Sequence, residues 1–118
     1  MRSPTNQWLR LTDWVNTKRL LWWLIAGTRG GVNRARIINL LHQRPYNANQ
    51  LANLLNLDYK TVRHHIDFLI KHGVLVQQGE GYGSVFFLSS EIDTNFESFE
   101  EIWAQIGKSG IGGNDESG

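Results

Sequence analysis

The fold is decided by residues 47–73, which read NANQLANLLNLDYKTVRHHIDFLIKHG. Asn47 and Asp58 are residue types that cap helix N-termini, and each precedes a run of apolar residues at helical spacing. Asn56 lies between the two runs and tolerates the left-handed backbone that often ends a helix. Gly73 ends the second run. The stretch therefore predicts two helices, 48–55 and 59–72, joined by a tight turn.

The segments on both sides extend this pattern. Upstream, Asn33 can cap a helix over residues 34–44, which Pro45 stops. Downstream, residues 74–78 and 84–88 have the composition of short β-strands, and the segment between them holds three glycines in five residues. Glycine-rich connections of this length are typical of hairpin loops. Three helices followed by a hairpin predict a winged helix-turn-helix, a mainly α fold with a small β-hairpin (α+β).

Two further helices are expected to flank this domain. Residues 3–26 begin with Ser-Pro, a favourable helix start, and end in a segment that is apolar on every side. Residues 91–106 carry apolar side chains at spacings of four and three, the pattern of a packed helix seam. We therefore divide the chain into a Trp-rich helix and Gly loop (1–31), a winged helix-turn-helix (32–90), an amphipathic helix (91–106) and a glycine-rich tail predicted to be disordered (107–118).

A specific resemblance is carried by residues 50–66, QLANLLNLDYKTVRHHI. This string resembles the helix-turn-helix of ArsR-type winged-helix regulators, particularly archaeal ones, and the likeness extends over about residues 33–90. The resemblance implies a cytoplasmic transcriptional regulator that binds double-stranded DNA with residues 59–72 in the major groove. Winged helices also serve as protein-interaction modules, so the resemblance is more specific for fold than for function.

Charge is distributed unevenly along the 118 residues. Residues 1–76 hold eleven Lys and Arg against three acids, a balance of +8, whereas residues 77–118 have a balance of −7. This asymmetry favours a polyanionic partner for the first part over two merely solvated faces. The absence of cysteine excludes disulfides and thiolate metal sites and fits a reducing compartment. The longest apolar run, residues 20–26, is too short to cross a bilayer, so no stable membrane insertion is expected.

The candidate DNA contacts fall into two sets. The N-terminal half of a recognition helix reaches base edges, where arginine can donate two hydrogen bonds to guanine. The candidates for base contacts are Tyr59, Lys60, Thr61, Arg63 and His64. Phosphates are bound by cations, hydroxyls and helix N-termini. The candidates for phosphate contacts are Arg29, Arg34, Arg36, Asn47, Asn49 and Tyr82. Arg63 is expected on the helix face opposite the apolar anchors Val62 and Ile66. The predicted wing carries Glu80 as its single charge, so we expect it either simply to pack or to touch the DNA backbone through Tyr82 and loop amides.

The flanking helices carry more apolar surface than a small winged-helix core can cover. We therefore predict a homodimer in which these helices meet across a two-fold axis. The expected interface residues are Trp14, Trp22, Ile92, Phe96, Phe99, Trp103 and Ile106. The alternative from another class is a winged-helix protein-interaction module, held near a membrane surface by the Trp-rich first helix.

Metal and enzyme functions receive little support from the sequence. His64, His65, Asp67 and His72 are close in sequence, but the resemblance implies that His65 packs partly inward as a structural residue. No metal site and no cofactor are predicted. The loop at residues 27–31 lacks the Gly-Lys-Ser/Thr ending of a phosphate-binding loop, and no catalytic triad or carboxylate pair is evident. We expect a protein that is not an enzyme.

Overall fold

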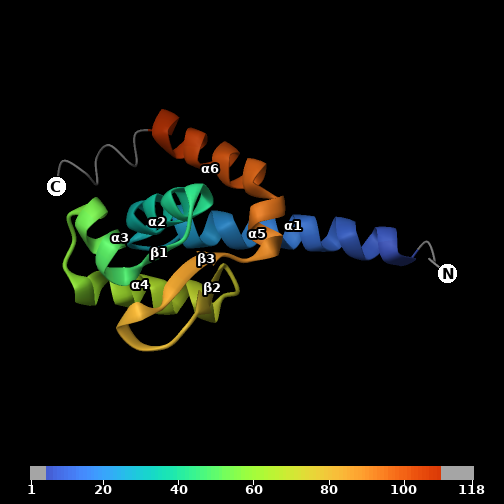
Figure 1. The fold of residues 1–118 in the computed structure, drawn as a ribbon. Coiled ribbons are helices and arrows are strands. Elements are labelled where there is room, and N and C mark those ends of the chain that lie inside the picture. The colour runs from blue at the N-terminus through green and yellow to red at the C-terminus, as the bar shows by residue number, and fades with distance from the viewer. Residues whose placement is uncertain (1–4, 110–118) are drawn as a thin grey trace. The chain divides into compact units, whose positions relative to one another are not determined.

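The computed structural model describes the backbone of residues 5–109 and the side chains of residues 15–107. Within that range the chain forms six α-helices, one 3₁₀ turn and a three-stranded sheet (Figure 1). Their order is α1 (Thr5–Ala26), α2 (Gly31–Gln43), β1 (Tyr46–Asn47), α3 (Ala48–Leu55), α4 (Tyr59–Lys71), β2 (Leu75–Gln78), η1 (Gly81–Gly83), β3 (Val85–Leu88), α5 (Ser90–Thr94) and α6 (Phe96–Ser109). The chain divides into two compact units. One is residues 32–94, and the other comprises the described parts of 1–31 and 95–118.

The helix-turn-helix lies in the unit of residues 32–94 and is formed by α3 and α4. Asn47 caps α3 through a reciprocal pair of hydrogen bonds with Gln50, in which each side-chain oxygen accepts from the other residue's backbone N–H. Asn56 has φ 58° and ψ 45°, which is the left-handed conformation expected at the end of α3. Asp58 then caps α4. The two predicted helices, their turn and their caps are therefore confirmed, except that α4 ends one residue earlier, at Lys71.

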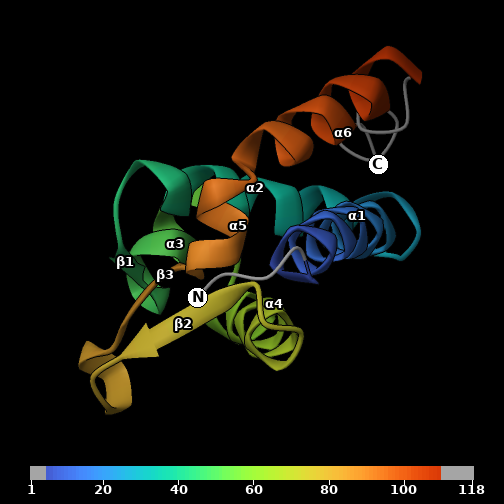
Figure 2. The same cartoon turned by 90° about the vertical axis from the view of Figure 1, so that its right-hand side faces the viewer.

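A small antiparallel sheet in the order β1-β3-β2 packs beside these helices. The hairpin of β2 and β3 was expected, and η1 forms the turn at its tip (Figures 1 and 2). Strand β1 was not expected. It pairs Tyr46 with Phe86 and Asn47 with Val85. A strand of two residues is too short to show the alternation of apolar and polar residues that identifies strands in a sequence. Its pairing partner, β3, is also far away in the sequence.

The core of this unit consists of the predicted apolar positions. Val62, Ile66 and Leu69 of α4 are fully buried, as are Leu51 of α3 and Phe86 of β3. Burying one such side chain contributes about 1.5–3 kcal/mol to folding. This packing fixes the orientation of α4, and thus determines which of its side chains remain accessible.

Helix α2 begins earlier than expected. Asn33 was predicted to cap it, but the helix starts at Gly31, and Asn33 lies inside it. Gly30 has a left-handed φ of 85°, and Gly31 follows it against the backbone of Ile25. A residue without Cβ can approach that backbone, so the chain turns into α2 three residues sooner than expected.

The second unit contains α1 and α6, which pack against each other. Lys18 of α1 donates to Glu101 of α6 at 3.0 Å, and Phe99 and Ile102 of α6 are buried. The C-terminal region was expected to form one helix ending near residue 106. It is instead interrupted at Asn95 and continues to Ser109, so residues 107–109 are helical. The rest of the predicted tail and the Ser3-Pro4 helix start lie outside the described residues.

In the described part of the chain, no helix is both long enough and apolar enough to cross a bilayer.

Candidate nucleic-acid interface

The N-terminus of α4 is organised by Asp58. Its carboxylate accepts from the Thr61 hydroxyl at 2.6 Å and from the Thr61 backbone N–H at 3.1 Å. These hydrogen bonds, that of the hydroxyl first, lower the pKa of Asp58 because they favour its ionised form. Thr61 thus has a role that the sequence analysis did not anticipate. Its hydroxyl proton is used in the helix cap, so the predicted contact of Thr61 with DNA is not favoured by this geometry.

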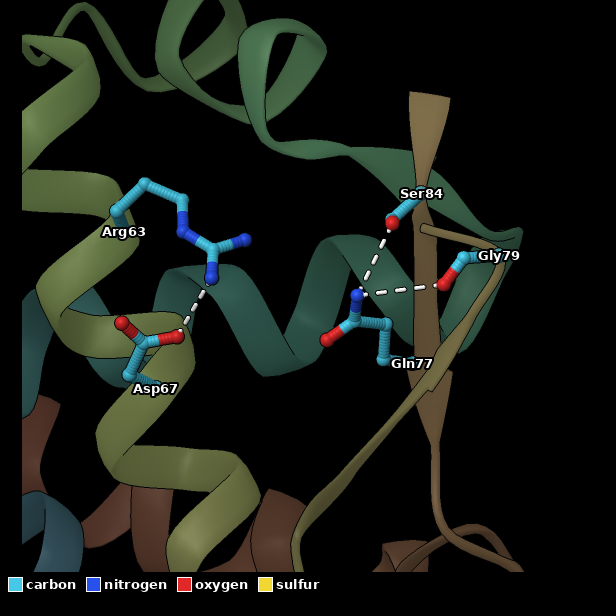
Figure 3. Close-up of polar contacts among 5 residues, drawn as sticks. All are labelled: Arg63, Asp67, Gln77, Gly79 and Ser84. Carbon is cyan, nitrogen blue, oxygen red and sulfur yellow. Dashed lines mark hydrogen bonds and ion pairs between the residues drawn. The ribbon is translucent and has the colours of Figure 1, made fainter. Parts of the chain in front are cut away.

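The wing lies against the start of the recognition helix. The rings of Tyr59 in α4 and Tyr82 in η1 are 5.9 Å apart and tilted by 47°. Tyr82 is nevertheless 86% exposed. Gln77 stabilises the wing by two hydrogen bonds. Its side-chain amide donates to the Ser84 hydroxyl at 3.0 Å and to the Gly79 carbonyl at 3.4 Å (Figure 3). Two predicted contact residues from distant parts of the sequence, Tyr59 and Tyr82, therefore form one surface.

Lys60 and His64 are exposed on α4, as expected. Arg63 lies differently from the prediction. Its guanidinium donates to Asp67 at 2.7 Å, and its central carbon is 5.4 Å from the centroid of the Phe86 ring. Arg63 therefore points toward the sheet (Figure 3), and the prediction that it projects opposite the apolar anchors of α4 is wrong. The stem of a long side chain can cover apolar surface while its charged end reaches solvent, which explains this placement.

Of the two predicted phosphate contacts on α2, one is buried and the other is half-buried. Arg34 is only 4% exposed, and its guanidinium lies 4.8 Å from the centroid of the Phe68 ring. Burial lowers the pKa of Arg34. The expectation that Arg34 extends toward phosphate is therefore corrected, and the stacking on Phe68 is its physical reason. Arg36 is half-buried and lies 3.4 Å from the side-chain oxygen of Asn33.

The remaining phosphate candidates cluster in sequence near α3, apart from Arg29. The Asn47 side-chain oxygen is occupied by the α3 cap, whereas Asn49 is exposed. Arg29 is exposed and belongs to the other unit. The sequence analysis missed Arg44, an exposed cation whose guanidinium lies 4.5 Å from the Tyr46 ring centroid at the entry to α3. Its position three residues before the Asn47 cap was the signal that could have identified it.

His65 is buried on the inner side of α4. It is 7% exposed, and its Nδ1 atom has no hydrogen-bond partner within the described structure. Burial, followed by the positive charge of Arg34 and the proximity of His64, lowers the pKa of His65. The inward packing expected from the family resemblance is thus observed. His65 is a neutral core residue at neutral pH and not part of the exposed face of α4.

Protonation of His65 is expected to destabilise the protein at acidic pH. Because its pKa is lower in the folded than in the unfolded chain, its stabilising contribution is present above the unfolded value of about 6.5 and is lost as the pH falls through the folded value. Urea unfolding between pH 7.5 and 5 should show this decline. The decline should persist in His64→Gln, an exposed control, and become shallower in His65→Gln. An unchanged slope in His65→Gln would contradict the assignment.

The predicted dimer residues are mostly buried within the chain. Ile92, Phe96, Phe99 and Ile106 are 1–7% exposed, so the structure corrects their assignment to an interface with a second copy. Trp103 is half-buried, and the side chain of Trp14 lies outside the described residues. Trp22, in contrast, is 46% exposed. These apolar residues do form one buried stripe, as predicted, but the stripe is covered by other parts of the same chain.

Among the described side chains, no three histidine or acidic residues lie close enough together to bind one metal ion. His65 and His72, which share a face of α4, contact ring neighbours instead, since His65 lies beside His64 and His72 beside Phe68.

The tri-helical arrangement, its tight turn and its hairpin define a winged helix-turn-helix protein. Residues 31–76, which span α2 to α4 and the start of β2, match the family described as "Bacterial regulatory protein, arsR family". No curated protein shows significant sequence similarity to the chain.

Solved structures share the fold at low identity. The homodimeric winged helix-turn-helix DNA-binding domain Mb0332 from Mycobacterium bovis, a possible ArsR-family transcriptional regulator, has a TM-score of 0.57 at 18% identity, covering 90% of this chain and 92% of its own. Reduced HlyU from Vibrio cholerae has a TM-score of 0.55 at 16% identity, covering 82% and 94%. The oxidized form of MarR from E. coli has a TM-score of 0.58 at 14% identity, and the match covers 89% of this chain and 77% of MarR. These likenesses confirm the predicted fold.

Proposed function

We propose that this protein is a sequence-specific transcriptional regulator that binds double-stranded DNA with the N-terminal half of α4. The observation that carries the proposal is the joined surface of α4 and the wing, where Tyr59 meets Tyr82 and exposed Lys60 and His64 lie on α4. The α4 part of this surface lies within residues 31–76, the segment that matches the ArsR family, and Tyr82 lies just beyond it. Lys60 is suited to phosphate or guanine, and Tyr82 to the sugar-phosphate backbone.

The distribution of charge supports the same proposal. The acids of residues 77–118 are concentrated in α5, α6 and the segment beyond, whereas eleven of the twelve Lys and Arg precede the wing. A polyanion is attracted to one set and repelled by the other. We therefore expect α6, with Glu97, Glu100 and Glu101, to remain away from phosphates in a complex.

The experiment that tests this function is selection of binding sites from random duplex DNA, followed by titration at several salt concentrations. A recurrent, roughly palindromic sequence is expected, and the logarithm of the affinity should fall with that of the salt concentration by about 0.9 per phosphate neutralised. Enrichment of no sequence, with binding to duplexes absent at low salt, would overturn the proposal. It would favour the protein-interaction module instead.

We further propose that the protein acts as a homodimer through the exposed face of α1. This face presents Val15, Trp22 and Trp23, which are 42–46% exposed. Beside Trp22 the unit of α1 and α6 has an open hollow of about 430 Å³, lined partly by Ile102 and Ala104. A protruding indole next to a hollow is the self-complementary arrangement that a two-fold interface needs. Mb0332, which shares the fold, is described as homodimeric.

The substitution Trp22→Asp is expected to convert the dimer into a monomer. A charge placed on this face would have to be desolvated in the interface, at a cost of several kcal/mol. Analytical ultracentrifugation at tens of micromolar should show the halved mass, with the helical circular dichroism signal retained. Leu54→Asp is the matched control, because Leu54 is 53% exposed but lies on α3, and it should stay dimeric. Equal masses for both variants would refute the interface.

A further inference from the structure

One ion pair on the recognition helix is not accounted for by the contacts proposed above. Arg63 and Asp67 lie one turn apart on α4, and a guanidinium nitrogen of Arg63 donates to Asp67 at 2.7 Å (Figure 3). The side chain of Arg63 is 30% exposed and that of Asp67 is 61% exposed. Exposed pairs of this kind contribute little to stability. A role other than stability is therefore needed to explain the one acidic residue within α4.

The surroundings of Arg63 restrict its guanidinium on a second side. The ring of Phe86, fully buried in β3, lies 5.4 Å from the guanidinium carbon. The ring cannot move without disturbing the core, and the carboxylate binds one edge of the guanidinium. The planar guanidinium is thus held in one orientation. Those of its five N–H donors that do not bind Asp67 can still donate to a ligand.

Asp67 is expected to weaken the affinity of α4 for DNA of any sequence. It is the single acidic residue of α4, and a carboxylate on a DNA-facing helix repels phosphates. A residue that weakens binding to every duplex while it orients a base-reading arginine favours discrimination over affinity. An unrestrained arginine would reach phosphates as readily as bases.

We propose that Asp67 is a specificity-determining residue, which positions Arg63 for base contact and keeps it from nonspecific phosphate contact. This inference rests on the proposed function of α4. Asp67 itself acts through Arg63 and need not touch the DNA. Its signature is therefore a change in the ratio of affinities for selected and scrambled duplexes, and not a uniform change in affinity.

The test compares Asp67→Asn with Glu80→Gln in the full-length protein. Both variants remove one acid from the surface of residues 32–94, but Glu80 is an exposed residue of the wing and is not paired with Arg63. Dissociation constants are measured on the selected duplex and on a scrambled duplex of equal composition, at two or more salt concentrations. Asp67→Glu keeps the carboxylate and serves as the rescue variant.

Asp67→Asn is expected to bind the scrambled duplex a few-fold more tightly and to lose about tenfold in the ratio of the two affinities, the order of one base contact. Glu80→Gln should raise both affinities alike and keep the ratio. Asp67→Glu should recover most of the ratio, and in an Arg63→Ala background Asp67→Asn should no longer change it.

Three results would overturn the inference. A ratio unchanged within twofold in Asp67→Asn would show that Asp67 is only a repulsive charge, while the proposed function would stand. An equal loss in Asp67→Glu would show that the charged pair is irrelevant. Wild-type protein that binds both duplexes equally would remove the proposed sequence specificity together with the inference, and that failure is visible before any variant is made.

Discussion

Arg63→Ala is expected to lower affinity for the selected duplex by about 1–3 kcal/mol, or roughly 5- to 150-fold, and to affect random DNA much less. Arginine contacts with guanine supply discrimination of this size when both hydrogen bonds are made. The fold should not suffer, because the pair with Asp67 is exposed and worth at most about 1 kcal/mol. Fluorescence anisotropy on selected and scrambled duplexes measures the effect.

The matched control is Arg36→Ala on α2. Arg36 is half-buried and lies near Asn33, so its free donors are suited to a phosphate at most. Its loss should weaken binding to both duplexes alike and reduce the salt slope by about one unit. If Arg63→Ala weakens both duplexes equally, Arg63 contacts the backbone and its assignment as a base-reading residue is wrong.

Gly31→Ala is expected to destabilise the protein by about 3 kcal/mol, the upper range for overpacking. A Cβ at Gly31 would overlap the backbone carbonyl of Ile25, and a backbone atom cannot rotate away as a side chain can. The chain would have to shift at the first residue of α2. Urea unfolding followed by circular dichroism should show a lower midpoint with little change in slope.

Gly83→Ala is the control for this substitution. No atom lies within 4 Å of a Cβ at Gly83, and its backbone is not in the left-handed region, so its stability should stay within about 0.5 kcal/mol of wild type. Similar losses in both variants would show that the effect reflects the removal of glycine in general and not the contact with Ile25.

Much of the fold could be predicted because its signals are local. Helix caps such as Asn47 and Asp58 satisfy backbone groups within three residues, and apolar periodicity on α3 and α4 identifies their buried faces. The start of α2 could not be predicted, since it depends on the space that Gly31 leaves beside Ile25. Strand β1 depends likewise on pairing with β3, almost forty residues away.

The candidate site was predictable by segment but not by side-chain role. The sequence placed Tyr59, Lys60 and His64 away from the buried face of α4; in the structure Lys60 and His64 are exposed and Tyr59 is half-buried. It could not show that Arg34 stacks on Phe68, that Thr61 is occupied by Asp58, or that Tyr82 returns to Tyr59. Each of these depends on which neighbour a flexible polar side chain finds in space.

The sequence by itself determined that this protein carries an ArsR-type helix-turn-helix with a wing, because caps, turn residues and apolar spacing act over a few residues. The tertiary structure alone decided which cations remain accessible and which aromatic residues are covered. Arginine and tryptophan have long or large side chains that combine apolar and polar parts, so their residue type does not decide whether they are covered. Their environment is set by the packing of distant elements, as Arg63 over Phe86 and the exposed Trp22 illustrate.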